Sequence, residues 1–283
     1  MTEQTVKDCL RLAVRQLQTA GHDNPQLEAD LLMAFTLEKD RSWLFAWPEY
    51  VLQKDDLQTF HLLLDKRLDG QPISYLTGER EFWGLRLKVS PATLIPRPET
   101  ELLVETALKL ITKPHARVID LGTGSGAIAI ALASERPDWT ISAADIDEDT
   151  LQIARENCQR HAPGIQLLHS HWLDQITDKG FDLIISNPPY IADNDPHLQR
   201  GDLRFEPSQA LASGADGLND IRQICRRAGK HLNANGWLML EHGYNQANQV
   251  FDLLNHNSFF QTQTLPDLNN QPRITIGCRC KSE

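Results

Sequence analysis

The segment best suited to chemistry is Asn187-Pro188-Pro189-Tyr190, which directly follows the apolar run 181–186. The run predicts a buried strand. The prolines end it, because neither can donate to a sheet ladder and each fixes its own φ. At the carboxyl end of a strand, the Asn187 side chain beside a rigid backbone carbonyl offers two acceptors for a planar –NH2 group, and Tyr190 can stack on its plane. These residues suit chemistry on an amide or amino nitrogen, although a plain turn with a surface tyrosine is the alternative.

A glycine-rich loop lies upstream, between a predicted strand at 117–121 and a helix of small apolar residues at 127–133. Its residues are Gly122, Thr123, Gly124, Ser125 and Gly126. Alternate glycines let a backbone turn tightly and approach a ligand, and the next helix offers unpaired N–H groups. A further strand at 140–144 ends in Asp145, where an acidic residue can accept hydrogen bonds from ribose hydroxyls. The pattern predicts a nucleotide-like cofactor, and a tight turn without a ligand is the alternative.

Two classes of cofactor use such a loop, and the spacing distinguishes them. A nicotinamide dinucleotide site has the pattern Gly-x-Gly-x-x-Gly and must accommodate a pyrophosphate. Here the spacing is Gly-x-Gly-x-Gly, with Asp120 just before the loop. A carboxylate is unhelpful beside a pyrophosphate, but it is compatible with S-adenosylmethionine (SAM), which carries a cationic sulfonium and an ammonium group. We therefore predict SAM.

Together these segments resemble the class I, Rossmann-like methyltransferases that modify planar nitrogens. Further segments resemble one family of that class, the peptide chain release factor glutamine methyltransferases; they are residues 79–84, 89–101, 204–207 and 240–243. The similarity extends from about residue 10 to residue 280. It implies an α/β fold, with a small helical domain before a seven-stranded SAM-dependent methyltransferase domain whose mostly parallel sheet ends in an antiparallel hairpin.

The resemblance also implies a reaction. The substrate would be a class-one release factor, methylated on the glutamine side-chain nitrogen of its Gly-Gly-Gln loop to give N(5)-methylglutamine. That –NH2 group would donate to the Asn187 side chain and the Pro188 carbonyl, while Tyr190 packs against the amide plane. The protein would then supply positioning for an in-line methyl transfer and no strong base.

The expected site residues form two overlapping groups. Those expected to bind SAM are Asp120, Gly122, Thr123, Gly124, Ser125, Gly126, Asp145, Trp172 and Asn187. Those expected to bind the substrate are Asn187, Pro188, Pro189 and Tyr190, with Asn187, Pro188 and Tyr190 as the catalytic set. The resemblance alone places Trp172 near the adenine, with core packing as the alternative. His171 departs from the family, where Asp is frequent, so the contact to the adenine amino group stays open. No metal site is expected, because the cysteines and histidines lack ligand spacing.

Charge and composition favour a protein substrate. The chain has 283 residues and a net charge of −10. Residues 1–75 hold 12 acidic and 8 basic side chains, a net charge of −4. Such a region is a poor platform for a polyanion, which weighs against the main alternative, an adenine-N(6) methyltransferase of DNA or RNA. A catalytically silent SAM-binding or docking module is the third reading.

No apolar run approaches the ~18 residues of a membrane span, and the N-terminus lacks the features of a signal peptide. We expect a cytoplasmic monomer without membrane association or direct nucleic-acid binding. Five scattered cysteines are expected to be reduced and structural. Cys278 and Cys280 should share one face of a terminal strand.

Three regions are expected along the chain: a helical substrate-docking domain at 1–72, an extended linker or hairpin at 73–95, and the methyltransferase domain at 96–283. Apolar stripes of helical spacing are Val6, Leu10, Val14 and Leu17; Leu27, Leu31, Leu32 and Phe35; and Leu57, Phe60, Leu63, Leu64 and Leu68. The aromatic residues Trp43, Phe45, Trp47 and Tyr50 favour a core position, although an exposed subset would suit docking.

The third region alternates helices and strands, which predicts a mostly parallel sheet. Helices are expected at 98–111, 148–160 and 218–232, and further strands at 165–169, 236–241, 258–264 and 273–280. The last two strands lie too close for a helical crossover, so they should pair antiparallel at the sheet edge.

Overall fold

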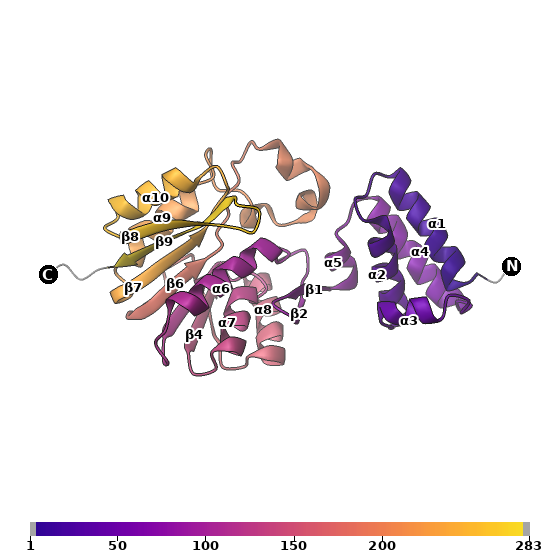
Figure 1. Ribbon diagram of the computed structural model, residues 1–283, viewed down its shortest axis with the longest axis horizontal. Coiled ribbons are helices and arrows are strands. Elements are labelled where there is room, and N and C mark those ends of the chain that lie inside the picture. Colours follow the sequence, from indigo (N-terminus) through magenta and orange to yellow (C-terminus); the bar gives the residue numbers. More distant parts are fainter. Residues whose placement is uncertain (1–3, 280–283) are drawn as a thin grey trace. The chain divides into compact units, whose positions relative to one another are not determined.

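The computed structural model describes residues 4–279, which divide after Gly78 into two compact units. The first is the helical unit. Its helices are α1 (Val6–Thr19), α2 (Pro25–Leu37), α3 (Arg41–Ala46), α4 (Lys54–Leu68) and α5 (Ile73–Thr77) (Figure 1). Helix α5 replaces the first part of the extended segment expected at 73–95, and Gly78 ends it in the left-handed conformation that favours glycine.

The core of the helical unit forms from α1, α2 and α4, as the apolar stripes predict. Leu17 and Phe60 are fully buried. The stripe on α2 is rotated from the expected one, because Met33 is fully buried whereas Leu27 and Phe35 are 40% and 45% exposed. Helix α2 contacts α1, α3, α4 and α5, so the residues it buries are set by four neighbours and not by one apolar face.

The four aromatic residues near α3 lie mostly at the surface. Phe45 and Trp47 are 68% and 58% exposed, and Tyr50 is 39% exposed. Trp43 packs partly on the core and stacks on Trp47, with ring centroids 6.4 Å apart. The expectation of a core position is therefore wrong for three of the four.

The second unit, the sheet unit, is built on a seven-stranded sheet of order β5-β4-β3-β6-β7-β9-β8. Its strands are β3 (Arg117–Leu121), β4 (Thr140–Asp145), β5 (Gln166–His169), β6 (Phe181–Ser186), β7 (Leu232–Glu241), β8 (Phe260–Pro266) and β9 (Pro272–Arg279). Strands β3 to β7 pair parallel, whereas β9 runs antiparallel to both β7 and β8. This confirms the mostly parallel sheet with a C-terminal antiparallel hairpin.

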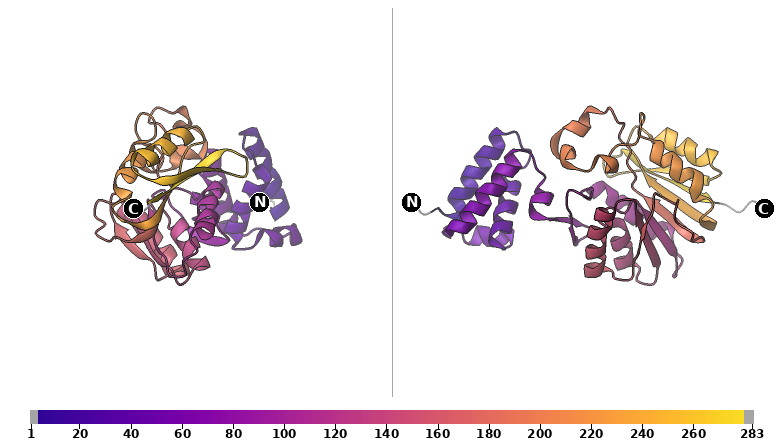
Figure 2. Two further views of the ribbon diagram at one scale, coloured as in Figure 1. Left: turned by 60° about the vertical axis from the view of Figure 1, so that its left-hand side comes forward. Right: turned by 180° about the vertical axis from the view of Figure 1, so that it is seen from behind.

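Helices cover both faces of this sheet (Figures 1 and 2). On one face lie α6 (Glu101–Leu110), α7 (Ala127–Glu135) and α8 (Glu148–His161), and on the other lie α9 (Asn219–Ala228) and α10 (Ala247–His256). Because both faces are covered, the central strands read as continuous apolar runs and not as alternating ones. The helix expected at 98–111 divides into a 3-10 turn, η1 (Pro98–Thr100), and α6.

Shorter elements join these layers. They are the antiparallel hairpin of β1 (Glu79–Phe82) and β2 (Leu85–Lys88), and the 3-10 turns η2 (Pro196–Gln199), η3 (Gly201–Phe205) and η4 (Ser208–Ala210). The three turns follow β6, and η4 contributes Gln209 and Ala210 to one wall of the site described below.

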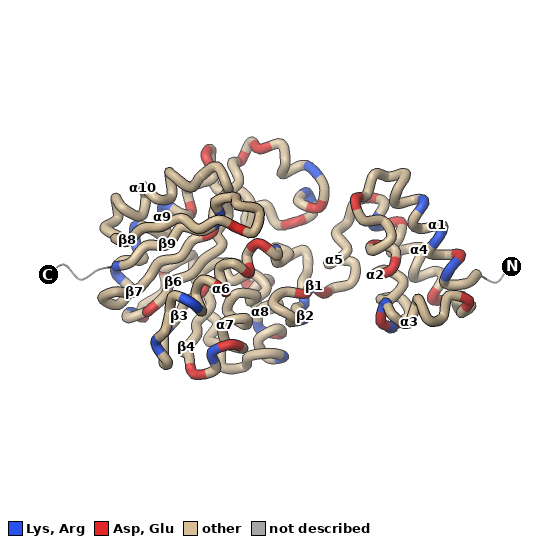
Figure 3. Tube along the Cα trace, viewed as in Figure 1, with Lys and Arg blue, Asp and Glu red and all other residues tan. Residues whose placement is uncertain are grey.

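Acidic and basic positions are intermixed along the described helices of the helical unit (Figure 3). Within residues 4–279, none of the helices combines the length and the apolar character needed to cross a membrane. Cys9, Cys158, Cys225 and Cys278 are buried, and Cys280 lies outside the described residues.

Candidate active site

The glycine-rich loop and the Asn-Pro-Pro-Tyr turn leave the sheet side by side. The chain runs outward from β3 to β4 and β5, then returns to place β6 on the other side of β3. This reversal of strand order creates a crevice at the carboxyl ends of β3 and β6, where open α/β sheets bind ligands. Leu121 pairs with Ser186, whose hydroxyl also donates to the Leu121 carbonyl at 2.7 Å. The last residue before each loop is thus tied to the other.

Backbone geometry explains the glycines of the loop. Gly122 and Gly124 have φ of 67° and 59°, in the left-handed region that glycine occupies without strain. A Cβ on Gly124 would meet no atom within 4 Å, whereas one on Gly122 would lie 3.0 Å from the Trp172 ring. The Gly124 N–H donates to Asp145 Oδ2 at 3.0 Å. The loop therefore presents bare backbone between an aromatic wall and a carboxylate.

A cavity opens at this crevice. Six residues expected at the site line it: Gly122, Gly124, Asp145, Trp172, Asn187 and Pro189. Residues that the sequence did not assign complete the lining: Ala92, Leu94, Ile146, Thr150, Ser170, His171, Pro207, Gln209 and Ala210. The cavity thus brings the glycine-rich loop together with Asn187 and Pro189 of the Asn-Pro-Pro-Tyr turn.

The other expected site residues are not part of this lining. They are Asp120, Thr123, Ser125, Gly126, Pro188 and Tyr190. Asp120 is fully buried, and its Oδ2 accepts a hydrogen bond from the Thr123 hydroxyl at 2.6 Å. Its carboxylate therefore stabilises the loop through this hydrogen bond.

Two carboxylates flank the loop in different environments. Burial raises the pKa of Asp120 to about 7, although the Thr123 hydroxyl opposes the shift. Burial also raises the pKa of Asp145, and the N–H groups of Gly124 and Asp147 oppose it. Asp145 lines the cavity, so its carboxylate can accept further hydrogen bonds there.

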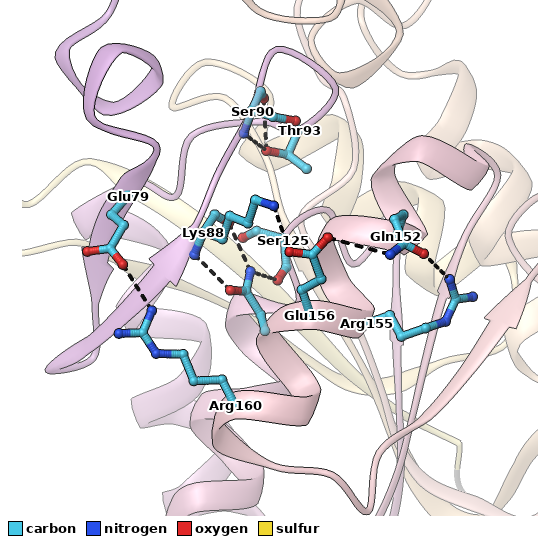
Figure 4. A network of polar contacts seen from close by, with 10 residues as sticks. Glu79, Lys88, Ser90, Thr93, Ser125, Gln152, Arg155, Glu156 and Arg160 are labelled. Atoms are coloured by element: carbon cyan, nitrogen blue, oxygen red, sulfur yellow. Dashed lines mark hydrogen bonds and ion pairs between the residues drawn. The ribbon is translucent and has the colours of Figure 1, made fainter.

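A buried asparagine ties the loop to the β1–β2 hairpin. Asn157 on α8 accepts from the Lys88 N–H at 2.7 Å and donates to the Lys88 carbonyl at 2.9 Å. The same Nδ2 donates to the Ser125 carbonyl at 2.8 Å. Figure 4 shows Lys88 and Ser125 at this junction, with the Lys88–Glu156 ion pair beside them. The position of the loop therefore depends on α8 and β2 as well as on β3.

The Asn-Pro-Pro-Tyr turn is held by side chains from distant elements. Asn187 Nδ2 donates to the Thr100 hydroxyl oxygen at 3.1 Å, which leaves Oδ1 as the end of the amide available to a ligand. The Tyr190 hydroxyl donates to Glu241 Oε1 at 3.3 Å, so its ring is anchored toward β7. Asn187 lines the cavity beside the cofactor loop, as expected of an acceptor for a substrate nitrogen.

Comparisons with known proteins agree with this arrangement. A family model of the PrmC N-terminal domain matches residues 8–78, and a model of the methyltransferase small domain matches residues 98–206. A release factor glutamine methyltransferase of Pseudomonas aeruginosa is 47% identical over 93% of this chain and 96% of that protein. The protein of the same description from Vibrio cholerae is 45% identical over 96% of each chain.

The chain belongs to the release factor glutamine methyltransferase family. It is a SAM-dependent methyltransferase. Among solved structures, a methyltransferase from Pyrococcus furiosus aligns with a TM-score of 0.55 at 17% identity, over 77% of this chain and 98% of that one. The catalytic domain of hMettl16 aligns with a TM-score of 0.57 at 16% identity, over 72% of this chain and 77% of that one. These two likenesses concern the fold alone.

The cavity fits the cofactor of this class. Trp172 and Ile146 provide apolar wall for a purine ring, and Asp145 provides acceptors for ribose hydroxyls. The bare backbone at Gly124 leaves room for close approach. When bound, SAM supplies an activated methyl group, and the residues around it supply binding and orientation. Among residues 4–279, no group of three or more His, Cys, Asp or Glu side chains is placed to hold a metal ion.

Glu206 is a structural residue that the sequence did not reveal. Its carboxylate accepts from the Ile95 N–H at 3.0 Å and pairs with Arg97. It thereby joins the segment carrying Ala92 and Leu94 to the one carrying Pro207, on two walls of the cavity. The resemblance to the family at 204–207 was the only signal for it, because its partners lie more than a hundred residues away.

His171 and Trp172 have different surroundings. The Trp172 indole donates to Asp220 at 2.9 Å, which fixes the ring against the glycine loop. His171 lines the same cavity, and its Nδ1 lies 3.5 Å from Asp174. Both residues thus reach the region where the resemblance implies the adenine.

Proposed function

We propose that the chain transfers the SAM methyl group to the glutamine side-chain nitrogen in the Gly-Gly-Gln loop of class-one peptide chain release factors. The observation that carries the proposal is the position of Asn187. Its carbonyl end is left for a ligand in the same cavity as Gly122, Gly124 and Asp145. A primary amide is an ordinary partner for such an acceptor.

The proposed role of the turn is to hold and aim the substrate nitrogen. Asn187 Oδ1 and the Pro188 carbonyl each accept one hydrogen of the –NH2 group. An amide nitrogen is a weak nucleophile because its lone pair is delocalised, so holding both hydrogens and the angle of approach matters more than a base. Tyr190 supports the turn through Glu241 and presents its ring near the amide plane.

The proposed cofactor contacts follow the cavity lining. Gly122 and Gly124 give close backbone approach, Asp145 binds the ribose and Trp172 flanks the adenine. Asp120, Thr123, Ser125 and Gly126 act from behind the lining by fixing the shape of the loop. Asp120 is therefore proposed to bind SAM through the loop and not by direct contact.

The helical unit is proposed to dock the release factor, with the domain boundaries expected at 72 and 95. Its exposed Phe45 and Trp47 fit a protein interface, in which aromatic residues are enriched. Its intermixed charges suit a protein better than a duplex (Figure 3). A cytoplasmic monomer without nucleic-acid binding completes the proposal.

The test is transfer of labelled methyl from SAM to a purified class-one release factor. Two controls run beside it, a factor with the loop glutamine changed to alanine and enzyme carrying Asn187→Ala. We expect label on the intact factor with wild-type enzyme and loss of label in both controls.

The outcomes separate the candidate substrates. Transfer to the alanine factor would place the methyl group on another residue and overturn the proposed acceptor. Bound SAM without transfer to any release factor, but with transfer to adenine in RNA or DNA, would overturn the proposed function.

A further inference from the structure

We infer that Gln246, the residue directly before α10, is a positioning residue that holds the ring of Tyr190 in place for the substrate amide. It bonds the backbone carbonyl of Tyr190 and does not touch the reacting atoms. The inference rests on the proposed function, because that function gives the Tyr190 ring its role beside the amide plane.

The Asn-Pro-Pro-Tyr turn has few backbone donors with which to fix itself. Pro188 and Pro189 have no N–H group, so two of its four residues cannot donate a backbone hydrogen bond. The carbonyl of Tyr190 is bonded from another loop, since Gln246 Nε2 donates to it at 2.9 Å. Gln246 is 6% exposed, so water has little access to replace this bond. The turn therefore depends on a distant side chain at its aromatic end.

Neighbouring strands bring Gln246 to this turn. Strands β6 and β7 pair parallel, with Ser186 opposite Leu240, so the turns that follow them leave the same edge of the sheet. The turn after β7, residues 242–246, is closed by the Gln246 N–H, which donates to the Gly243 carbonyl at 2.9 Å. From there the Gln246 side chain reaches back to the turn after β6.

The groups around the Gln246 side chain fix the direction of its amide. Oε1 accepts from the Gly243 N–H at 2.9 Å, so the oxygen end points to the turn after β7. Nε2 donates to the carbonyls of Tyr190 and Asp216, at 2.9 and 3.2 Å. An –NH2 group has two hydrogens, and here each has a carbonyl acceptor. A reversed amide would place its oxygen against two carbonyl oxygens, so the observed orientation is the stable one.

Tyr190 is held at both ends. Gln246 bonds its carbonyl, and its hydroxyl donates to Glu241 Oε1 at 3.3 Å. Between these two points the ring packs, partly buried, against the apolar cluster formed by β6, β7, α9 and α10. The next residue is also fixed, because the Ile191 N–H donates to the Leu211 carbonyl at 2.9 Å. A shift of the Tyr190 carbonyl must therefore move the ring or break its bond to Glu241.

A glycine leaves room for the bond between Gln246 and Tyr190. Gly217 has φ of +73°, and a Cβ there would lie 2.1 Å from the Tyr190 carbonyl oxygen and 2.8 Å from Gln246 Nε2. Both distances are shorter than nonbonded atoms allow. A side chain at position 217 would therefore displace the Tyr190 carbonyl, the Gln246 amide or both.

The first test is Gln246→Glu. The variant keeps the side-chain length and the acceptor for the Gly243 N–H, but it replaces the donating –NH2 group by an oxygen that faces two carbonyls. We expect kcat for release factor methylation to fall by about 10- to 100-fold, because a small misplacement near the reacting groups costs that much. The KM for the release factor should change little. SAM affinity should also change little, because Gln246 and Tyr190 are not among the residues that line the cofactor cavity.

This variant separates two roles of Gln246. If the side chain served only to support the turn before α10 through Gly243, Gln246→Glu would keep that contact and its kcat would equal that of wild type. Such a result would overturn the inference.

The second test is a double-mutant cycle between Gln246 and Tyr190. Tyr190→Ala removes the ring and keeps the backbone carbonyl. If Gln246 acts through the ring, Gln246→Glu should lower kcat in the wild type but have little further effect in Tyr190→Ala. Losses that simply multiply in the double variant would overturn the inference, because Gln246 would then act independently of the ring.

The third test compares Gly217→Ala with Gly214→Ala. Gly214 lies in the same loop, has φ of +77°, and a Cβ there would meet the Asn219 side chain at 2.0 Å. Both variants share the strain of a side chain at positive φ, but only Gly217→Ala meets the Tyr190 carbonyl. We expect kcat of Gly217→Ala to be lower than that of Gly214→Ala by on the order of tenfold or more, with similar SAM affinities. Equal kcat values would overturn the inference.

Thermal melting and SAM titration of every variant establish that it is folded. The Gln246 and glycine variants change different residues, so one set tests the inference if a member of the other does not fold. A wild-type enzyme that binds SAM but methylates no release factor would instead overturn the proposed function, so the two failures are distinct.

Discussion

The cofactor side and the substrate side of the site both follow the end of a parallel strand, yet they are held in different ways. On the cofactor side, Asp120 holds Thr123 three residues away, and Asp145 holds Gly124. On the substrate side, Asn187 is held by Thr100, 87 residues away, and Tyr190 by Glu241, 51 residues away. The first side is shaped mainly by local backbone, whereas the second requires the whole sheet to be assembled.

Two buried carboxylates make the contrast sharper. Asp120 and Glu241 are 0% and 1% exposed, and burial raises the pKa of each to about 7. Each has one oxygen without a hydrogen-bond partner among the described residues. Asp120 accepts from Thr123 in a loop whose shape glycines already favour, while Glu241 accepts from the Tyr190 hydroxyl across the sheet. A buried carboxylate thus supports a local contact on one side and a distant contact on the other.

The largest effect should come from the substrate side. We expect Asn187→Ala to lower the rate of methyl transfer by about 10²–10³, the usual result of losing one preorganised polar contact. SAM affinity should fall much less than the transfer rate, because the glycine loop and Asp145 are untouched. Single-turnover transfer and calorimetric SAM titration measure the two quantities separately. A parallel loss of SAM affinity would show that the two sides are not independent.

Asp145→Ala should give the reverse pattern. The variant loses acceptors for ribose and for the Gly124 N–H, so SAM affinity should fall by about 10–100-fold, as expected for hydrogen bonds to a charged group. At saturating SAM, transfer should stay close to wild type. Reduced transfer at saturation would contradict the separation, because it would mean that Asp145 also positions the substrate side.

The contrast between local and distant contacts also explains which site residues could be predicted from the sequence. The glycine spacing, Asp145 and Asn187 were found because each lies in a short run whose neighbours determine its conformation. Thr100, Glu206 and Asn157 were not assigned roles, because their partners are brought near only by sheet pairing and helix packing. The mostly parallel sheet and its terminal hairpin followed from periodicity and connection length. The rotated stripe on α2 did not, because four neighbouring helices determine it.

Asp120→Asn should alter how stability depends on pH. An ordinary aspartate loses its proton near pH 4, whereas buried Asp120 keeps it to about pH 7. Between these values the folded chain binds more protons than the unfolded chain, so the free energy of unfolding falls as pH rises. The variant does not lose stability in this way. Its free energy of unfolding should therefore exceed that of wild type by on the order of 1–3 kcal/mol as the pH rises from about 4 to about 7.

Urea unfolding across that pH range measures the difference in stability. The contribution of Glu241 titration cancels, because both proteins contain Glu241. Glu156→Gln, an exposed carboxylate change in the Lys88 ion pair, is the matched control and should show no comparable trend. A difference between Asp120→Asn and wild type that does not vary with pH would mean that Asp120 is ionised throughout.

The smallest effect tests how far backbone alone shapes the cofactor side. Gly124 has φ of +59° and faces open space, so Gly124→Ala should cost about 1 kcal/mol of stability through backbone strain. Its new methyl group would project into the space proposed for SAM and should weaken SAM binding severalfold. Gly164→Ala is the matched control, because Gly164 also has no neighbour within 4 Å but lies outside the left-handed region. The control should leave stability and SAM binding unchanged. Equal effects in both variants would show that the loop does not require the left-handed turn at Gly124. The cofactor side would then depend on a distant partner, Asn157, just as the substrate side depends on Thr100 and Glu241.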